Sequence, residues 1–514
     1  MRFGMSWSKS LERVAPLLAV ALLVACLLGG CASRSPYRQE FVELRTGNFI
    51  LTSSLSPEAT TEFALQLELF QAGVRALLGL PDEAVPTTPT RVYVFDDRSL
   101  GRPFAVENEA AYLLDEVDAP ILVFRGGRDF AARATPDLRH RYAHRMLRDH
   151  AKTERPLWYE EGVSQLARTI EETDRGFVLG RLAPEWKASV LDWRSGDLIG
   201  SLQRADLSEA TASERMRFEA QTWAIAHTLE FGDGPASGSP NPLAAYRAAL
   251  DAPDVATRDQ ALDAIGLSSV ALEKKVYEHL EKPRPKARLH EIHGLQTNRW
   301  KPVALSLAES RTRLGELALR LERSDLALDY FERALDKDPK HAGARIGRAI
   351  AAAKLGHPDV VAATFESLQL LPEMPSELHV AAGDAHRAVA ERSDSPERRR
   401  EALAAARACY GEVLANPRPP VRAALGMAIA QLAVAGENPA EAFDWLERVR
   451  ASQPGSLTLE LWIARAEAAS GQPRLGQIRA RNVVSRTHDR ALEKSARDLI
   501  ESVDTSESSE SGGR

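Results

Sequence analysis

A chain of 514 residues is too long for one hydrophobic core, so its length predicts two to four domains. With 44% hydrophobic and 27% charged residues, its composition is that of an ordinary globular protein. The formal net charge of −6 leaves no broad basic surface to neutralise phosphates, which argues against nucleic acid as the main partner.

The first thirty residues have the pattern of an export signal. Arg2, Lys9 and Arg13 precede the apolar run APLLAVALLVACLLGG, which is too short and wrongly flanked for a membrane-spanning helix. The run ends in LLGGC, which resembles a bacterial lipobox, whose cysteine is lipidated before the chain is cleaved in front of it. The resemblance implies a signal peptide over residues 1–30 and lipidation of Cys31, with a plain signal peptide or an uncleaved anchor as the alternative.

A lipidated Cys31 would tether a soluble domain to the membrane, because its acyl chains are buried in the bilayer. Residues 31–40 would form the tether. By the sorting rule of such lipoproteins, Ala32 directly after the cysteine implies the outer membrane of a bacterial cell envelope, facing the periplasm. After export Cys409 would have no disulfide partner, so we expect stability to come from packed domains.

Short β-type runs alternate with one long helix between residues 41 and 125. FVELRTGNFILTSS predicts two strands joined by a Thr-Gly-Asn turn, and RVYVF and APILVF predict two more. Between them, apolar residues from Pro57 to about Leu78 recur at helical spacing. These elements predict a small mixed sheet with a helix beside it.

Helical patterns dominate from residue 137 to residue 282. DLRHRYAHRMLRDHA and RPLWYEEGVSQLARTI predict two consecutive helices, the second with Pro156 in its first turn. Residues 171–282 continue as amphipathic helices that include FEAQTWAIAHTLEF. The sequence EKPRPKARLHEIHG, residues 281–294, has the pattern of an extended linker, which we place at residues 283–304.

The chain repeats itself from residue 305 to residue 500. One strong match to a tetratricopeptide repeat is carried by the positions Leu314, Gly315, Ala327, Phe331, Ala334 and Pro339. Weaker copies follow, which together predict a solenoid with a concave groove suited to a peptide or a protein helix. The alternatives are a rigid spacer or a cover for the first domain. The charged, Ser-rich residues 501–514 predict a disordered tail.

The segment RHRYAHRMLRDHAKTERPLWYEEG, residues 139–162, contains candidate metal ligands. Residues four apart share one face of a helix, so His140 and His144 can offer their imidazoles to one ion. Glu161 would supply a third ligand from the next helix. Three protein ligands leave a fourth position open, which is the arrangement of a catalytic zinc site.

Residues from about 41 to 282 resemble the bacterial peptidase-MA-like domain of the gluzincin metallopeptidases, a family often fused to tetratricopeptide repeats. His140 and His144 match the histidines of its H-E-x-x-H motif. PLWYEEG matches its W-x-x-E-G segment at Trp158, Glu161 and Gly162. FEAQTWAIAHTL is similar to a helix that follows the site in that family.

This resemblance implies the fold class and the division into domains. We expect an α+β, zincin-like N-terminal domain followed by an all-α tetratricopeptide-repeat solenoid. Residues 41–170 would be the peptidase-like subdomain, and residues 171–282 a helical subdomain that completes it.

The sequence departs from the family at Arg141, where the family has a glutamate that takes a proton from the metal-bound water. A guanidinium stays protonated and has no acceptor lone pair, so Arg141 cannot act as this general base. Its charge would also oppose a divalent cation, by roughly 4 kcal/mol at ~4 Å and an effective dielectric constant near 20. Whether zinc is retained stays open, because Arg141 could turn to solvent or pair with Glu161 in place of the metal.

Three further residues are expected to support the site. Trp158, three residues before Glu161, can pack beneath it, and Gly162 inside a helix suggests that two helices approach closely there. His227 could contact a substrate oxygen if its helix lines the cleft, whereas a single histidine on an amphipathic helix is more often structural.

Two main hypotheses follow from these residues. In the first, a lipid-anchored peptidase-like protein has lost proteolysis and binds an envelope protein or peptide through its repeats. In the second, the protein is an active zinc metallopeptidase with an unconventional base, cleaving envelope proteins or peptides. In a third, all function lies in the solenoid and the first domain is a structural platform.

Overall fold

The computed structural model describes residues 39–511 except for several short segments. The segments outside the described residues are 81–87, 107–108, 128, 131–133, 152–153, 194–197, 233–240, 253–261, 263–265, 267, 283–286, 293–296, 369–375, 417–418 and 435–438. The predicted signal peptide and Cys31 therefore also lie outside the described residues. Within the described part of the chain, no helix combines the length and apolar character needed to cross a membrane.

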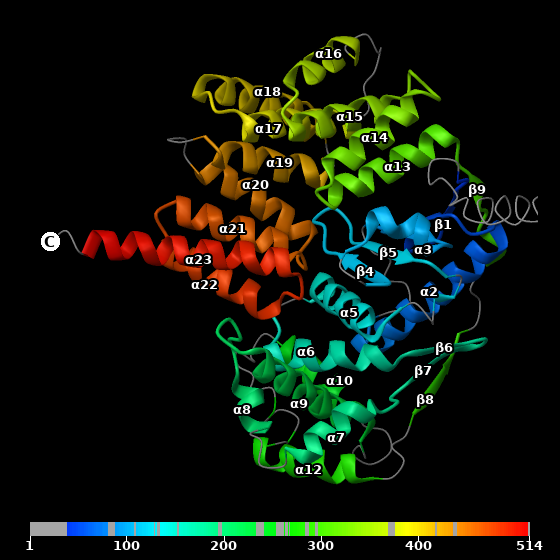
Figure 1. The fold of residues 1–514 in the computed structure, drawn as a ribbon. Helices are drawn as coiled ribbons and strands as arrows, with labels where there is room; N and C mark the ends of the chain where they lie inside the picture. Colours follow the sequence, from blue (N-terminus) through cyan, green and yellow to red (C-terminus); the bar gives the residue numbers. More distant parts are fainter. Residues whose placement is uncertain are drawn as a thin grey trace, which may run out of the picture.

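A six-stranded mixed sheet forms the centre of the first domain, with the order β4-β5-β3-β2-β1-β9 (Figure 1). Its strands are β1 Val42–Arg45, β2 Phe49–Ser53, β3 Thr90–Phe95, β4 Ala111–Leu114, β5 Ile121–Arg125 and β9 Val303–Ala304. Strands β2, β3 and β5 are parallel, whereas β1 and β4 pair antiparallel with their neighbours. The four strands predicted from sequence are confirmed, and β4 and β9 were not predicted.

Three helices build the core on one face of this sheet. They are α2 Pro57–Leu78, α5 Pro136–His150 and α6 Leu157–Leu166. The side chains of Ser56 and Thr135 cap α2 and α5 by accepting hydrogen bonds from backbone N–H groups of the first turns, and Pro occupies the first helical position of both. Short elements α3 Arg98–Gly101 and η2 Arg102–Phe104 follow β3.

A helical subdomain extends the first domain on the side of α6. Its elements are η3 Ala167–Thr169, α7 Pro184–Asp192, α8 Leu198–Gln203, α9 Ala212–Phe231, α10 Pro242–Leu250 and α12 Ser269–Glu281. A small sheet of β6 Glu171–Thr173, β7 Gly176–Leu179 and β8 Arg288–Glu291 lies beside it.

The segment predicted as an extended linker takes part in both sheets. Strand β8 pairs antiparallel with β7, and β9 pairs antiparallel with β1, with η4 Thr297–Arg299 between them. Backbone pairing thus fixes the chain between the two domains at two points. The pattern of apolar residues did not predict these strands, because β8 and β9 are mostly exposed.

Antiparallel helix pairs make up the rest of the chain. The helices are α13 Leu307–Arg320, α14 Ser324–Leu335, α15 Ala342–Leu355, α16 Pro358–Leu368, α17 Ser376–Arg392, α18 Pro396–Leu414, α19 Val421–Leu432, α20 Pro439–Ser452, α21 Leu457–Ala469, α22 Pro473–Arg486 and α23 Arg490–Ser511. The repeat spacing has a steric basis, because the ring of Phe331 in α14 would lie 2.7 Å from a Cβ on Gly315 of α13 and 2.3 Å from a Cβ on Gly347 of α15.

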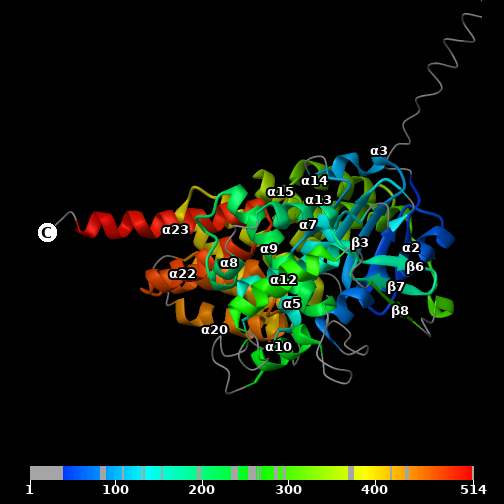
Figure 2. The ribbon, with the colours of Figure 1, turned by 90° about the horizontal axis from the view of Figure 1, so that it is seen from below.

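Helix α23 replaces most of the predicted disordered tail. It continues to Ser511 and projects from the rest of the molecule, as Figure 2 shows. Ion pairs four residues apart, Lys494–Asp498 and Arg497–Glu493, support the part of α23 that precedes the predicted tail.

The first repeat of the solenoid covers the second face of the sheet. Side chains alternate along β3, so that Val92 and Val94 face α2 and α5, whereas Tyr93 and Phe95 enter a second apolar cluster. This second cluster contains Phe331 and other buried residues of α13 and α14. The solenoid is therefore part of the packing of the first domain.

The inner side of the solenoid also receives a loop of the first domain. Asp115–Asp118 connects β4 to β5, and the side chain of Val117 is buried in an apolar cluster with residues of α19–α21. On either side, Glu116 and Asp118 pair with Arg320 of α13, at 2.7 and 3.2 Å. The sequence left three roles open for the repeats: a groove for a peptide or protein helix, a rigid spacer, and a cover for the first domain. The contacts of Glu116, Val117 and Asp118 are those of a cover.

The last repeats reach the helices α5 and α6 (Figure 1). Arg145 donates to Gln453 at 3.0 Å, and Arg148 donates to the carbonyl oxygen of Gly455 at 3.1 Å. A Cβ at Gly455 would lie 2.3 Å from Asp149, so the turn between α20 and α21 lies directly against the end of α5.

Candidate metal centre

Helix α5 places His140 and His144 on one buried face. The two side chains are 5% and 3% exposed, and their Nε2 atoms lie 3.0 Å apart. Their spacing of four residues produces this juxtaposition, because it turns the chain by little more than one helical turn.

Helix α6 brings Glu161 to the same point. Glu161 Oε1 lies 2.9 Å from His140 Nε2, and Glu161 Oε2 lies 3.2 Å from His144 Nε2. A Cβ at Gly162 would lie 2.4 Å from the carbonyl oxygen of Thr222, so the close helix contact at this glycine is with α9. Trp158 is fully buried and packs against the rings of Tyr159 and Tyr246.

A fourth candidate ligand, His488, comes from the solenoid. It lies between α22 and α23, and its Nε2 is 3.7 Å from Glu161 Oε2. One ligand atom from each of His140, His144, Glu161 and His488 can be chosen so that all four lie within 4.8 Å of one another. Sequence reasoning missed His488, because it lies far along the chain and outside any ligand motif.

The distances within this cluster suit a tetrahedral ion. Zn–N bonds of about 2.0–2.1 Å place neighbouring ligand atoms about 3.3–3.4 Å apart in an ideal tetrahedron. Individual separations include 2.9 Å (His140 Nε2 to Glu161 Oε1) and 3.7 Å (His488 Nε2 to Glu161 Oε2), and all four ligand atoms lie within 4.8 Å of one another. Three imidazoles and one carboxylate are also ligand types that zinc accepts.

A further observation tests the fit to a metal. The Nε2 atom of His488 is buried and has no hydrogen-bond partner among the described residues. A buried ring nitrogen without a partner costs free energy. A metal ion bound by the other three residues would satisfy this nitrogen, so the residues present fit zinc.

Polar groups around the cluster orient its ligands. Glu160 Oε1 lies 3.1 Å from His144 Nδ1, and Gln165 donates to Glu161 Oε1 at 2.8 Å. Carboxylates in this position fix the ring and the tautomer of a metal-binding histidine. The position of Glu160 suits this supporting role.

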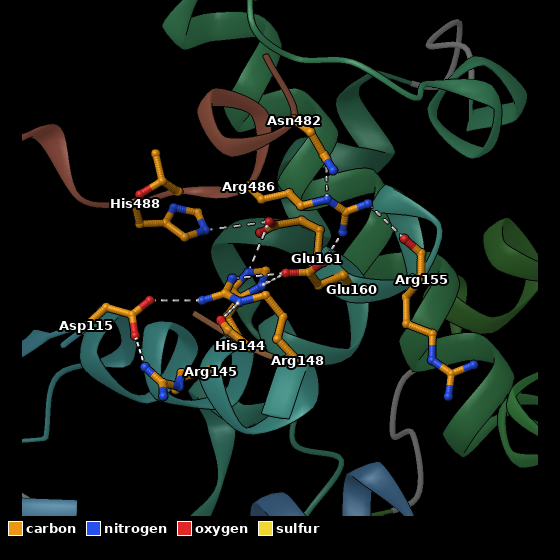
Figure 3. A network of polar contacts seen from close by, with 12 residues as sticks. Asp115, His144, Arg145, Arg148, Arg155, Glu160, Glu161, Asn482, Arg486 and His488 are labelled. Carbon is orange, nitrogen blue, oxygen red and sulfur yellow. Dashed lines mark hydrogen bonds and ion pairs between the residues drawn. The ribbon is translucent and has the colours of Figure 1, made fainter. Parts of the chain in front are cut away.

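Two arginines from different domains hold Glu160 (Figure 3). Arg148 of α5 donates to Glu160 Oε1 at 3.0 Å, and Arg486 of α22 pairs with Glu160 Oε2. Arg486 also donates to the carbonyl oxygen of Arg155 at 3.0 Å and pairs with Glu154 at 2.9 Å. The solenoid thus contributes two residues at the cluster: Arg486, which contacts Glu160, and the candidate ligand His488.

The local environment favours ligand protonation states for three of the four groups. Burial lowers the pKa of His140 to about 4, against the opposing attraction of Glu161. Burial and the nearby His140 hold the pKa of His488 well below its ordinary value, although 26% of its side chain is exposed. Burial opposes ionisation of Glu161, but His140 and His144 overcome it and hold the pKa of Glu161 well below its usual range. Neutral imidazoles and an ionised carboxylate are the forms that bind metal.

His144 differs from the other three groups of the cluster. Burial disfavours its charged form, but Glu161 and Glu160 outweigh burial and raise the pKa of His144. The raised pKa favours the protonated ring, which opposes metal binding because only a neutral imidazole binds a metal.

Arg141 lies beside the cluster without entering it. Its side chain is 31% exposed and pairs with Glu109 in the segment before β4, with Nη2 and Oε1 3.7 Å apart. The carboxylate of Glu161 is instead bonded to His140, His144 and Gln165. The guanidinium does not fill the space between the ligands.

His227 lies in the helical subdomain, away from the ligand cluster. It is fully buried, with Nδ1 2.9 Å from His279 Nε2 and Nε2 3.2 Å from the carbonyl oxygen of Gly180. Burial and His279 lower the pKa of His227 to about 3. These contacts are those of a structural histidine.

The space above the ligands is small. A cavity of about 30 Å³ is lined by Arg141, His144 and His488 together with neighbouring residues of β4, α21 and α22. Sites that bind small molecules are usually about 300–1,000 Å³, so this cavity is small by comparison. A larger cavity of about 480 Å³ lies between α5, α6 and α20–α22, and it borders Glu160 rather than the ligand nitrogens.

Comparisons with known proteins identify no family. No protein-family model matches the chain, and no curated protein matches it. The chain is similar to the crystal structure of TTC0263, a thermophilic TPR protein of Thermus thermophilus, at 20% identity and a TM-score of 0.33, over 38% of this chain and 98% of that one. It is also similar to PilW, a widely conserved type IV pilus biogenesis factor, at 20% identity and a TM-score of 0.30, over 41% of this chain and 96% of that one. Scores this low carry no argument, and the repeat assignment rests on the helix pairs themselves.

Proposed function

We propose that this chain is a lipid-anchored protein of the bacterial cell envelope in which a gluzincin-like domain no longer hydrolyses peptides. In this proposal the domain and the repeat solenoid together form a protein-binding scaffold. The observation that carries the proposal is Arg141, which stands where the family has its proton-transferring glutamate. A permanently protonated guanidinium cannot accept a proton from a metal-bound water.

The shape of the site supports the same conclusion. The cavity above His144 and His488 is about 30 Å³, far below the roughly 300–1,000 Å³ that is typical of ligand-binding sites. The two carboxylates nearest the histidines are already engaged, since Glu161 contacts the histidines and Glu160 is paired with Arg148 and Arg486.

A protein-binding role for the repeats is supported by what their inner side holds in this chain. It accepts the acidic segment Asp115–Asp118, with Val117 buried and Glu116 and Asp118 paired with Arg320. Repeats of this kind present such a groove to peptides and helices in general. The first partner of the solenoid is thus its own first domain.

A weakly active zinc metallopeptidase is the second candidate, and one observation favours it. Glu219 of α9 lies 3.5 Å from Gln165, which bridges it to Glu161. Burial, together with the charge of Glu161, raises the pKa of Glu219 to about 8. A carboxyl group that titrates near neutral pH has the acidity of a general acid or base.

Peptide hydrolysis by the purified protein with added Zn²⁺ tests the two candidates. We expect no cleavage above that of the His144→Ala variant, and we expect the Arg141→Glu variant to remain inactive, because His488 still covers the ligands. Hydrolysis by the unmodified protein that disappears in both His144→Ala and Glu219→Gln would establish the peptidase instead.

Removing the solenoid is not a clean test of the third hypothesis, in which the first domain is only a platform. The second apolar face of the sheet, with Tyr93 and Phe95, packs against α13 and α14. Deletion of residues 305–500 would expose this face to water, so loss of binding would also report a damaged first domain.

A further inference from the structure

We propose that His488 is a fourth protein ligand to a zinc ion held by His140, His144 and Glu161, and that this ligation clips the repeat solenoid onto the first domain. The inference deepens the proposed function, because it assigns the site a structural use in place of hydrolysis. Structural zinc sites have four protein ligands, whereas catalytic sites keep one position for water.

Geometry is the first support for this assignment. The Nε2 atoms of His140 and His144 and both oxygens of Glu161 face one point, and the ring of His488 lies over that point. The centroid of the His488 ring is 4.8 Å from that of His140 and 4.9 Å from that of His144. A ring in this place takes the position that a catalytic water would need.

The buried, unpartnered nitrogen of His488 is the second support. Its Nε2 has no hydrogen-bond partner among the residues that the structure describes, although Glu161 Oε2 is 3.7 Å away. An acceptor at this distance is too far for a hydrogen bond but is at the right distance for two ligands of one ion. The unsatisfied nitrogen therefore points to a ligand that lies between the two side chains.

The chain on both sides of His488 is fixed, which limits how far the ring can move. Before it, Arg486 is anchored to Glu160 and to the carbonyl oxygen of Arg155. After it, Asp489 caps α23 by accepting hydrogen bonds from the N–H groups of Ala491 and Leu492, at 2.8 and 3.2 Å. A ligand that is held in place before the metal binds loses little conformational entropy on binding.

Zinc binding to the full chain tests the assignment. The protein is stripped of metal with a chelator, and its Zn²⁺ affinity is measured by competition with a chromophoric chelator. The variants are His488→Ala, His488→Gln, which keeps much of the side-chain volume, and His357→Ala as a control at an exposed histidine of the repeats. Circular dichroism establishes that each variant is folded.

We expect one Zn²⁺ per chain in the unmodified protein and in His357→Ala. Both His488 variants should bind Zn²⁺ at least about 100-fold more weakly, since loss of a supporting residue alone costs 10–100-fold and a direct ligand should cost more. Hydrogen exchange provides a second readout: Zn²⁺ should slow the exchange of amides in the segment 486–492 in the unmodified protein, but not in the His488 variants.

Two results would overturn the assignment. One is Zn²⁺ binding that is equally tight with and without His488, and the other is no Zn²⁺ binding by the unmodified protein. Neither result would imply that the protein hydrolyses peptides. The zinc ligation by His488 can therefore be refuted while the proposed loss of proteolysis stands. Conversely, zinc-dependent hydrolysis would refute the proposed function whatever the affinity of the His488 variants.

Discussion

The ion pair between Arg486 and Glu160 should be the strongest single electrostatic contact between the solenoid and the first domain. The two side chains are 10% and 2% exposed, and the guanidinium also donates to the carbonyl oxygen of Arg155 at 3.0 Å. Removing one member of a buried pair typically costs 3–5 kcal/mol, because the other charge stays buried without its partner. Arg148 still contacts Glu160 at 3.0 Å, so we expect Arg486→Ala to cost about 2–4 kcal/mol.

Arg481 provides a matched control on the same helix. It pairs across the same interface with Glu209 at 3.4 Å, but the two side chains are 34% and 78% exposed. Exposed pairs are screened by water and contribute about 0–1 kcal/mol. Arg481→Ala should therefore change the stability of the interface little, although it removes the same charge from α22.

Hydrogen exchange of the backbone amides in α22 measures the free energy with which the solenoid end opens from α6. Arg486→Ala should lower this free energy by about 2–4 kcal/mol and Arg481→Ala by less than about 1 kcal/mol. Arg486→Lys should be intermediate, because it keeps the charge but loses the planar fork. Equal effects of the two alanine variants would refute the argument that burial gives the Arg486 pair its strength.

Two further predictions concern stability. Gly162→Ala should destabilise the protein by about 1–3 kcal/mol in urea unfolding, because its Cβ would lie 2.4 Å from the backbone oxygen of Thr222. Gly411→Ala, with nothing within 4 Å of its Cβ, should be neutral or stabilising. Similar losses of stability in both variants would contradict the steric argument. The Glu309–His341 pair, 2.9 Å apart, should stabilise the first repeat most between about pH 4.5 and 6.5, where both groups are charged in the folded and unfolded chain. Hydrogen bonding to Glu309 raises the pKa of His341, so this stability is lost as the pH rises through that raised pKa. Hydrogen bonding to His341 lowers the pKa of Glu309, so the stability is also lost as the pH falls through that lowered pKa, and thermal unfolding of Glu309→Gln should show a flatter pH profile.

Local sequence signals predicted the elements that carry the three helical ligands. The helical pattern that begins at residue 137 predicted α5, and the spacing of four residues places His140 beside His144 whatever the rest of the fold does. The helix predicted from Pro57 to about Leu78 matches α2, because its apolar residues recur at helical spacing. These features depend on residues that are close together in the chain.

The parts that sequence missed depend on contacts between distant residues. His488 reaches Glu161 across the interface between two domains, and no periodicity or motif within the repeats marks it as a ligand. Strand β9 has two exposed residues and forms only because β1 offers an unpaired edge. The groove of the repeats could be predicted, but not that segment Asp115–Asp118 of the same chain would enter it.

Zinc binding and domain docking must strengthen each other by the same factor if His488 is a ligand. Coupling between two equilibria is reciprocal, so an ion that binds the docked state 100-fold more tightly also stabilises docking by 100-fold, or about 2.7 kcal/mol. This amount is comparable to that expected for the Arg486–Glu160 pair, which acts at the same interface. The two contacts also share a support, because Glu160 pairs with Arg486 and holds the ring of His144. We therefore expect Arg486→Ala to weaken Zn²⁺ binding as well as docking, and unchanged Zn²⁺ affinity in that variant would show that the two contacts are independent.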